Sequence, residues 1–122
     1  MPHAEPKFPF FIATELRSLS AEEYALVAKI AANEAPEYQK ELADLKVVGR
    51  CGCGACPTVF FQPHQTGERE QEIASYAGKD SWGGVVGILL WAKGGHLSQL
   101  EFYSVDGHDP WSIPAESTIE RF

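Results

Sequence analysis

The sequence predicts an α+β fold in which two N-terminal helices pack on a four- or five-stranded antiparallel sheet. Three observations lead to this prediction: a strong helix-start signal near the N-terminus, a second helix signal directly after it, and strand hairpins in the remainder. With 122 residues, the chain has the length of one domain that can bury a core without disulfide or metal cross-links. We therefore expect residues 1–122 to form a single domain.

The chain begins with a segment, residues 1–18, that we expect to be an extended lead-in. It holds three prolines and an aromatic cluster over residues 8–12, whose side chains we expect to pack on the core. The segment lacks the basic start, apolar stretch and cleavage site of a secretory signal, so the cytoplasm is the expected location. No apolar run is long enough to cross a bilayer, and no membrane partner is expected.

The two helix signals follow this lead-in. Ser20 and Glu23 have the spacing of a capping box, which predicts a helix that begins at Ala21. Apolar residues then recur at helical spacing until residues 33–36 supply a stop. Pro36 also suits the first turn of a second helix.

Strand signals begin after the second helix. Residues 47–48 and 58–61 are β-branched or aromatic and flank a segment rich in glycine and cysteine, which predicts a hairpin. The strongest hairpin prediction joins residues 84–93 to 96–105 through Gly94-Gly95, because two glycines provide the positive φ angles of a tight hairpin turn. Residues 106–122 contain two prolines and are expected to form an irregular tail.

Three cysteines, Cys51, Cys53 and Cys56, lie at the tip of the first predicted hairpin. Thiolates this close on a glycine-rich turn can converge on a soft metal ion, of which zinc is the usual one. Zinc takes four ligands, so the set is incomplete. The fourth ligand would have to be one of the later histidines, none of which has a recognised ligand spacing: His64, His96 or His108.

Cys53 and Cys56 also have the spacing of a redox dithiol. In such motifs the N-terminus of a following helix acidifies the first thiol, whereas here the sequence continues as a predicted strand. A cysteine-dependent zinc or thiol-redox module is therefore an alternative function. A third possibility is that the cysteines are only small residues at a tight turn.

The charge balance bears on possible partners. Ten Lys and Arg against seventeen Asp and Glu give a net charge of -7, which opposes binding to nucleic acids and anionic lipids. Between Gly94 and Glu120 there are five acidic residues and no Lys or Arg. We expect this part of the chain to form a negative surface, which could recognise a basic partner or simply maintain solubility.

The string Asp106-Gly107-His108-Asp109 is a second candidate for chemistry. It could bind a cation or act in acid/base catalysis if a pocket brought further ligands to it, but such strings are often solvated turns. No paired motif elsewhere completes a catalytic set. The expectation is that the protein is not an enzyme.

Two segments carry a resemblance to a known group of proteins. They are Val-Gly-Arg-Cys-Gly-Cys-Gly with Cys-Pro-Thr-Val, over residues 48–59, and Leu-Ser-Gln-Leu-Glu-Phe-Tyr-Ser, over residues 97–104. This pattern resembles a group of small uncharacterised bacterial proteins with a glycine-cysteine hairpin followed by a Leu-Ser-x-Leu-Glu-x-Tyr-Ser hairpin. The resemblance covers about the last two thirds of the chain and implies no established activity. In that group the third cysteine directly follows the second glycine, whereas here Ala55 intervenes.

By size and charge alone, the chain is similar to bacterial immunity proteins, which cover the basic active site of a toxin with complementary charge. The leading hypothesis is therefore a non-enzymatic acidic binding protein that neutralises a toxin and needs no cofactor. Exposed acidic and aromatic side chains near the C-terminus would form its binding face. The expected face consists of Glu101, Tyr103, Asp106, Asp109, Trp111 and Glu116.

Overall fold

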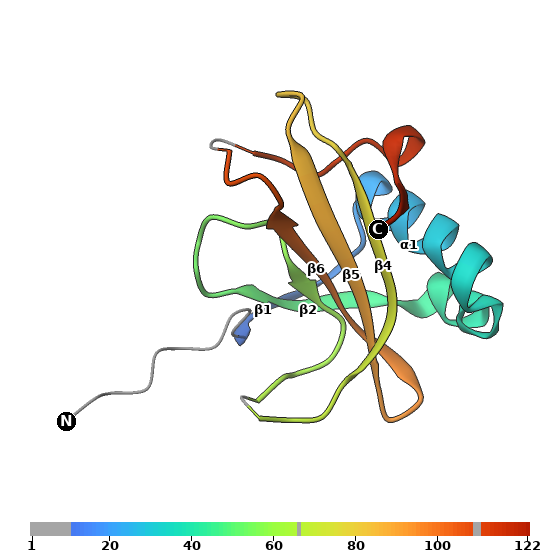
Figure 1. The fold of residues 1–122 in the computed structure, drawn as a ribbon. Helices are drawn as coiled ribbons and strands as arrows, with labels where there is room; N and C mark the ends of the chain where they lie inside the picture. The colour runs from blue at the N-terminus through green and yellow to red at the C-terminus, as the bar shows by residue number, and fades with distance from the viewer. Residues whose placement is uncertain (1–10, 66, 109–110) are drawn as a thin grey trace.

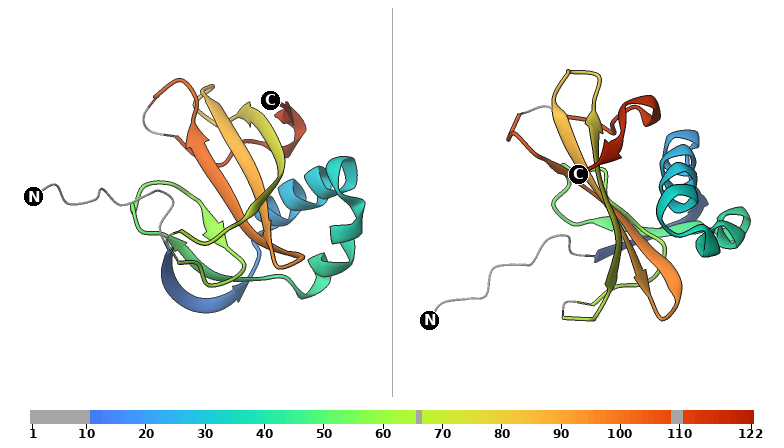
Figure 2. Two further views of the ribbon diagram at one scale, coloured as in Figure 1. Left: turned by 60° about the horizontal axis from the view of Figure 1, so that its bottom comes forward. Right: turned by 45° about the vertical axis from the view of Figure 1, so that its right-hand side comes forward.

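The computed structural model describes residues 11–65, 67–108 and 111–122. Seven antiparallel strands form one sheet in the order β1-β2-β3-β6-β5-β4-β7 (Figure 1). One α-helix lies against a face of this sheet, as the right-hand view of Figure 2 shows. The prediction of two helices on a four- or five-stranded sheet is therefore wrong.

The elements in chain order are β1 (Phe11–Ser18), α1 (Ala21–Glu34), the 3₁₀-helix η1 (Pro36–Asp44), β2 (Lys46–Cys51), β3 (Val59–Phe60), β4 (Gln71–Lys79), β5 (Val85–Lys93), β6 (His96–Ser104), the 3₁₀-helix η2 (Glu116–Thr118) and β7 (Glu120–Arg121). The two strands that the sequence did not predict, β1 and β7, are the outermost strands of the sheet.

Helix α1 begins where the capping box predicts. The Ser20 hydroxyl accepts the N–H of Glu23 at 3.1 Å, and the Glu23 carboxylate accepts the N–H of Ser20 at 2.8 Å. Pro36 does open a second helical segment, but η1 is a 3₁₀-helix in which only Leu42 is buried. The expected second α-helix is thus a tighter turn structure that connects α1 to β2.

Strand β1 occupies part of the predicted lead-in. It pairs with β2 from Phe11↔Cys51 to Ser18↔Lys46, with an irregularity in between. Its side chains are exposed over nearly the whole length of the strand. The strand therefore lacks the alternation of apolar and polar residues that identifies a half-buried strand in a sequence. The expected packing of the aromatic side chains in the lead-in is confirmed for Phe11. Its ring lies edge-to-face against the ring of Phe60, with 5.3 Å between the ring centroids. Residues 8–10 lie outside the described residues.

The hairpin of β5 and β6 is confirmed. Gly94 and Gly95 both have positive φ angles, 63° and 81°, which side chains rarely permit. Leu100 and Phe102 on β6 are buried in the core. Gln99 is buried as well, and its amide donates to the carboxylate of Glu70 at 2.7 Å.

The core fills the space between α1 and the sheet. Buried side chains of α1, including Leu26 and Ile30, share one apolar cluster with Ile88 of β5 and Leu100 of β6. Trp111 of the C-terminal segment, expected to be exposed on the binding face, is partly buried and packs against this cluster. None of the helices in the described part of the chain has the length and apolar character that a membrane span requires.

Candidate metal centre

The three cysteines meet at the tip of the β2–β3 hairpin. Cys51 is the last residue of β2, and Cys53 and Cys56 lie in the turn that leads to β3. Their sulfur atoms all lie within 4.8 Å of one another. Cys51 is buried, Cys56 is half-buried and Cys53 is exposed, so the cluster extends from the interior to the surface.

The turn directs backbone N–H groups at the sulfur atoms. Gly54 has a φ of 73°, which reverses the chain between Cys53 and Cys56. Cys53 Sγ accepts the N–H groups of Ala55 at 3.4 Å and Cys56 at 3.2 Å, and Cys51 Sγ accepts the N–H of Cys53 at 3.5 Å. Ala55, the residue that departs from the resembled pattern, thus supplies a donor to the cluster.

Cys53 and Cys56 differ in their readiness to ionise. Burial raises the pKa of the Cys53 thiol, but the N–H groups of Ala55 and Cys56 lower it more strongly, to about 7. Burial raises the pKa of Cys56 to about 12, and the neighbouring Cys53 thiol acts in the same direction. The two sulfur atoms lie 3.2 Å apart. Cys53 is therefore the thiol that carries negative charge first.

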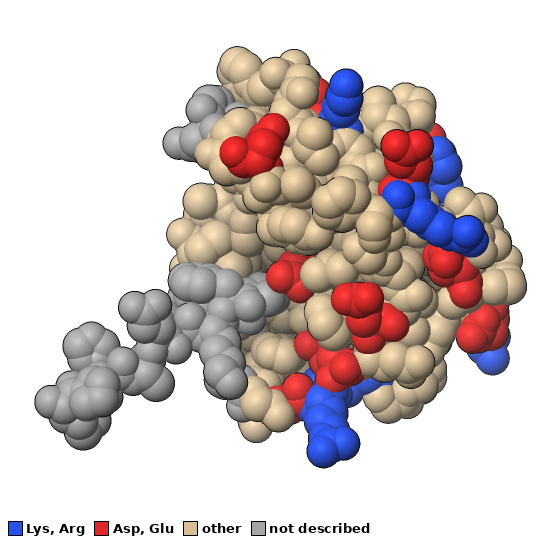
Figure 3. Space-filling model, viewed as in Figure 1, with Lys and Arg blue, Asp and Glu red and all other residues tan. Residues whose placement is uncertain are grey.

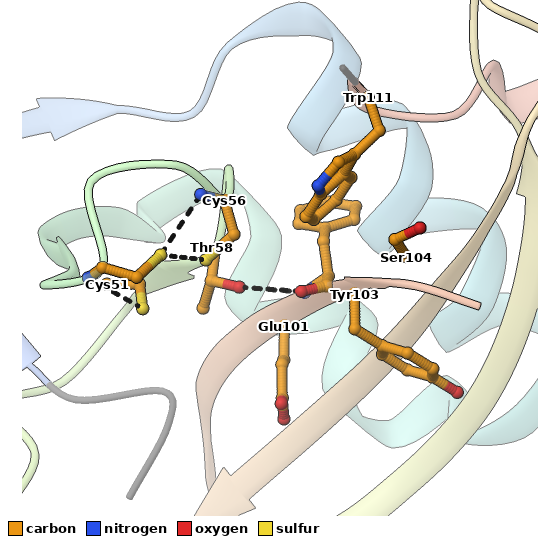
Figure 4. Close-up of a pocket in the computed structure, with 9 residues that line it drawn as sticks. Cys51, Cys56, Thr58, Glu101, Tyr103, Ser104 and Trp111 are labelled. Carbon is orange, nitrogen blue, oxygen red and sulfur yellow. Dashed lines mark hydrogen bonds between the residues drawn. The ribbon is translucent and has the colours of Figure 1, made fainter. Parts of the chain in front are cut away.

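All three cysteines line one side of a pocket of about 270 Å³. Figure 4 shows Cys51 and Cys56 on one side of the pocket and Trp111 across from them. The remaining lining comes mostly from the end of β6: Thr58, Glu101, Phe102, Tyr103, Ser104 and Trp111. The site thus combines a thiol cluster with a mostly apolar hollow.

The pocket exists because β3 is short. β3 pairs with β6 only at Leu100 and Gln99, so no strand of the described residues lies beside the next part of β6 on that side. There Thr58 takes the place of a strand: its Oγ1 accepts the N–H of Phe102 at 2.9 Å and donates to the Phe102 carbonyl at 3.4 Å. Thr58 therefore anchors the cysteine turn to β6 at a fixed distance.

Tyr103 and Glu101 are held by their neighbours on β5. The ring of Tyr103 covers Gly87, where a Cβ atom would lie 2.1 Å from Tyr103 Cζ. Glu101 accepts the indole N–H of Trp91 at 2.9 Å. Burial raises the pKa of Glu101, and the negative charges of other glutamates add to this effect: Glu70 and Glu72. In the view of Figure 3, acidic side chains gather over the middle of the molecule and basic ones lie toward its margins.

The residues of the expected binding face are divided among several places. Glu101, Tyr103 and Trp111 meet in the pocket beside the cysteines. Asp106 is engaged by His108, and Glu116 lies in η2, where its backbone carbonyl accepts the Lys29 ammonium at 3.0 Å. Asp109 lies outside the described residues.

His108 of the Asp106–Asp109 string is surrounded by polar groups. Its Nε2 lies 2.9 Å from Asp80 Oδ2, and its Nδ1 contacts both Asp106 and, at 3.0 Å, the hydroxyl of Ser104. Ser104, His108 and Asp80 thus have the order of a serine–histidine–aspartate relay. The hydrogen bonds to Asp80 and Asp106 raise the pKa of His108, which favours the charged form of the ring. The cluster joins the C-terminal segment to the β4–β5 turn, because both the His108 ring and the N–H of Ser112 contact Asp80.

None of the three candidate histidines joins the cysteines. His96 lies 3.3 Å from Glu41, His64 lies beside Phe60 and Glu70, and His108 binds Asp80. Within residues 11–65, 67–108 and 111–122, no fourth histidine, cysteine or carboxylate ligand completes the group. The three close cysteines can hold a metal ion, and they offer it three sulfur ligands.

Comparison of the chain with protein-family models, curated proteins and solved structures gives no match. Its function is therefore inferred from the geometry and chemistry of the site.

Proposed function

We propose that the protein binds one zinc ion through the thiolates of Cys51, Cys53 and Cys56. The observation that supports this function is the convergence of three sulfur atoms within 4.8 Å on a turn whose N–H groups point at two of them. Thiolate is the commonest zinc ligand in structural sites, and N–H groups directed at sulfur stabilise its negative charge.

The spacing of the sulfur atoms suits such an ion with small adjustments. Sulfur atoms bound to one tetrahedral zinc ion at about 2.3 Å lie roughly 3.8 Å from each other. The distance between Cys53 Sγ and Cys56 Sγ is 3.2 Å, so the pair needs to open by less than 1 Å, on the order of a side-chain rotation. With a pKa of about 7, Cys53 is partly ionised at neutral pH and can bind the ion before Cys56, whose pKa is raised to about 12, loses its proton.

Metal analysis tests this proposal directly. Protein purified under reducing conditions without chelator is expected to carry about one zinc ion per chain, a stoichiometry set by a single three-thiolate site. Single Cys51→Ser, Cys53→Ser and Cys56→Ser variants are expected to lose most of the bound zinc. His96→Ala is the matched control, because His96 lies against Glu41 rather than the cysteines, and it is expected to retain zinc. Zinc content that is negligible, or that Cys53→Ser leaves unchanged, would contradict the proposal.

A second candidate is thiol–disulfide exchange by Cys53 and Cys56. One observation favours it: the sulfurs lie 3.2 Å apart, with Cys53 exposed and Cys56 half-buried behind it. In this reaction the Cys53 thiolate attacks a low-molecular-weight disulfide and releases one half as a thiolate. The Cys56 thiolate then attacks Cys53 Sγ and releases the second half, so the added disulfide is reduced to two thiols as the protein dithiol is oxidised.

The two candidates differ in a simple experiment. Oxidised glutathione added to metal-free protein is expected to remove two hydrogen atoms from the intact mass without leaving an adduct, and Cys56→Ser is expected to trap the mixed disulfide. If zinc binding is the function, one equivalent of zinc should suppress this reaction, because the ion occupies both sulfur atoms. Rapid oxidation that zinc does not slow would favour exchange over metal binding.

Binding of a basic toxin stays a prediction. Three residues of the expected face, Glu101, Tyr103 and Trp111, adjoin one another, and the net charge of -7 favours a basic partner. Co-purification with a toxin encoded beside this chain is the direct test. Glu101→Lys should weaken the complex, whereas Glu37→Lys, at an exposed position of η1 outside the expected face, serves as the matched charge control. Equal effects of the two reversals would exclude the pocket as the contact surface.

A further inference from the structure

We infer that the metal ion keeps one coordination position open to the pocket, where it binds a small, neutral nitrogen heterocycle. This inference rests on the proposed zinc site and adds to it a class of ligand. Three features of the structure support it: the number of sulfur ligands, the walls of the pocket and the charge around the ion.

The open position follows from the ligand count. Zinc is almost always four-coordinate in proteins, and sites with three protein ligands hold water or a substrate in the fourth position. No fourth ligand completes the group among the described residues. All three cysteines line the same pocket, so an ion that they hold is adjacent to this cavity. A ligand that fills the fourth position can therefore enter from the pocket.

The walls of the pocket select for a small flat molecule. Phe102, Tyr103 and Trp111 contribute aromatic or apolar lining. The position of Tyr103 is fixed by its close packing on Gly87, and that of Phe102 by the two hydrogen bonds of its backbone to Thr58. The volume of about 270 Å³ lies just below the range of roughly 300–1,000 Å³ of drug-sized ligand sites. Such a space suits a molecule built on a single ring.

Charge selects against an anion. Three thiolates and one divalent ion carry a net charge of -1 on ordinary valence arithmetic. Glu101 is among the lining residues, and the whole chain carries a net charge of -7. An anionic fourth ligand would have to overcome this field, whereas a neutral nitrogen donor meets the preference of zinc for imidazole-type ligands. An aromatic ring on that donor can also pack against Trp111.

Cobalt-substituted protein and imidazole test the inference. Cobalt(II) bound by the cysteines gives sulfur-to-metal charge-transfer bands, which report on the metal site, and visible bands, which report on the fourth ligand. At a pH where imidazole is neutral, we expect it to change the visible bands saturably with one molecule bound per ion, while the charge-transfer bands remain. Acetate is the anionic control and is expected to bind at least about tenfold more weakly than imidazole.

Two variants locate the bound imidazole. Trp111→Ala is expected to weaken imidazole binding about tenfold, the value of one lost aromatic contact, with cobalt affinity unchanged. Trp82→Ala is the matched control, because the Trp82 side chain is exposed and lies outside the pocket lining. Tyr103→Leu provides a second test if Trp111→Ala fails to fold, since leucine still covers Gly87 but removes the ring.

The outcomes separate this inference from the proposed function. Cobalt bound with sulfur charge-transfer bands but unresponsive to imidazole would overturn the open position and leave the three-cysteine site intact. Acetate binding as tight as imidazole binding would overturn the assigned ligand class. Equal imidazole affinity of the Trp111→Ala and Trp82→Ala variants would overturn the location of the ligand beside Trp111. Protein that binds no cobalt would overturn the proposed function and the inference together.

Discussion

The Nε2 atom of His108 lies 2.9 Å from Oδ2 of Asp80, whose side chain is fully buried. Burial raises the pKa of Asp80, but hydrogen bonds from His108 and from three backbone N–H groups outweigh it and lower the pKa to about 2. The hydrogen bonds to Asp80 and Asp106 raise the pKa of His108. This ionic contact holds the C-terminal segment against the β4–β5 turn beside the pocket.

The first prediction concerns the pH dependence of stability. The pKa of Asp80 is below its ordinary value of 3.8, so its contribution is present above pH 3.8 and is lost as the pH falls through about 2. The pKa of His108 is above its ordinary value of 6.5, so its contribution is present below pH 6.5 and is lost as the pH rises through the raised pKa. Denaturant unfolding as a function of pH is expected to show a maximum between these limits.

Histidine variants isolate this effect. His108→Asn is expected to flatten the fall in unfolding free energy on the alkaline side of the maximum. His96→Asn is the matched control, because its side chain is 73% exposed and distant in sequence from the Asp80 contact. If the two variants give the same pH profile, the contact between His108 and Asp80 does not stabilise the fold.

The second prediction concerns the reactivity of the thiols. In metal-free protein, iodoacetamide is expected to modify Cys53 first, because the thiolate is the nucleophile and Cys53 is both exposed and lowered in pKa to about 7. The modification rate should rise with pH around that value. Peptide mass spectrometry identifies the modified residue. Faster modification of Cys56, whose pKa is raised to about 12, would show that the N–H groups do not stabilise the Cys53 thiolate.

The third prediction concerns the anchor of the cysteine turn. Thr58→Val keeps the shape of the side chain but leaves the buried N–H of Phe102 without its acceptor, at an expected cost of about 1–3 kcal/mol in unfolding free energy. Thr58→Ser keeps the hydroxyl and should lose less. Urea unfolding of the metal-free variants measures both values. A Thr58→Val variant as stable as Thr58→Ser would mean that this hydrogen bond does not hold the turn to β6.

The fourth prediction concerns the packing of the Tyr103 ring on Gly87. Gly87→Ala would place a Cβ atom 2.1 Å from Tyr103 Cζ, so the ring must move, and we expect a loss of about 1–3 kcal/mol in unfolding free energy. In a Tyr103→Ala background, where the ring is absent, Gly87→Ala should lower the unfolding free energy much less than it does in the wild type. Additive effects in this cycle, measured by urea unfolding, would contradict the close packing of the two residues.

Local signals in the sequence predict the local parts of the fold. The capping box at Ser20 and Glu23 and the glycines at 94–95 act within a few residues, and both elements form where expected. Strand β1 could not be recognised because its exposed side chains leave no alternating pattern, and β7 is too short to have one. These two edge strands arise from pairing with distant strands, which a local pattern does not encode.

The candidate site is also predictable from the sequence only in part. The sequence places the three cysteines together because they lie within one turn. It does not show that Glu101, Tyr103 and Trp111 adjoin them, because that contact depends on the late start of β3 and the path of the C-terminal segment. The sequence does not single out Thr58 or Asp80, since an isolated threonine or aspartate carries no spacing signal.

The central claim is that three cysteine thiolates hold one metal ion. X-ray absorption at the zinc edge of the loaded, reduced protein counts the sulfur ligands directly. The proposed site predicts three sulfur atoms at about 2.3 Å and one lighter atom at about 2.0–2.1 Å. A first shell of nitrogen and oxygen atoms alone, or a spectrum that Cys51→Ser leaves with the same sulfur count, would contradict the claim.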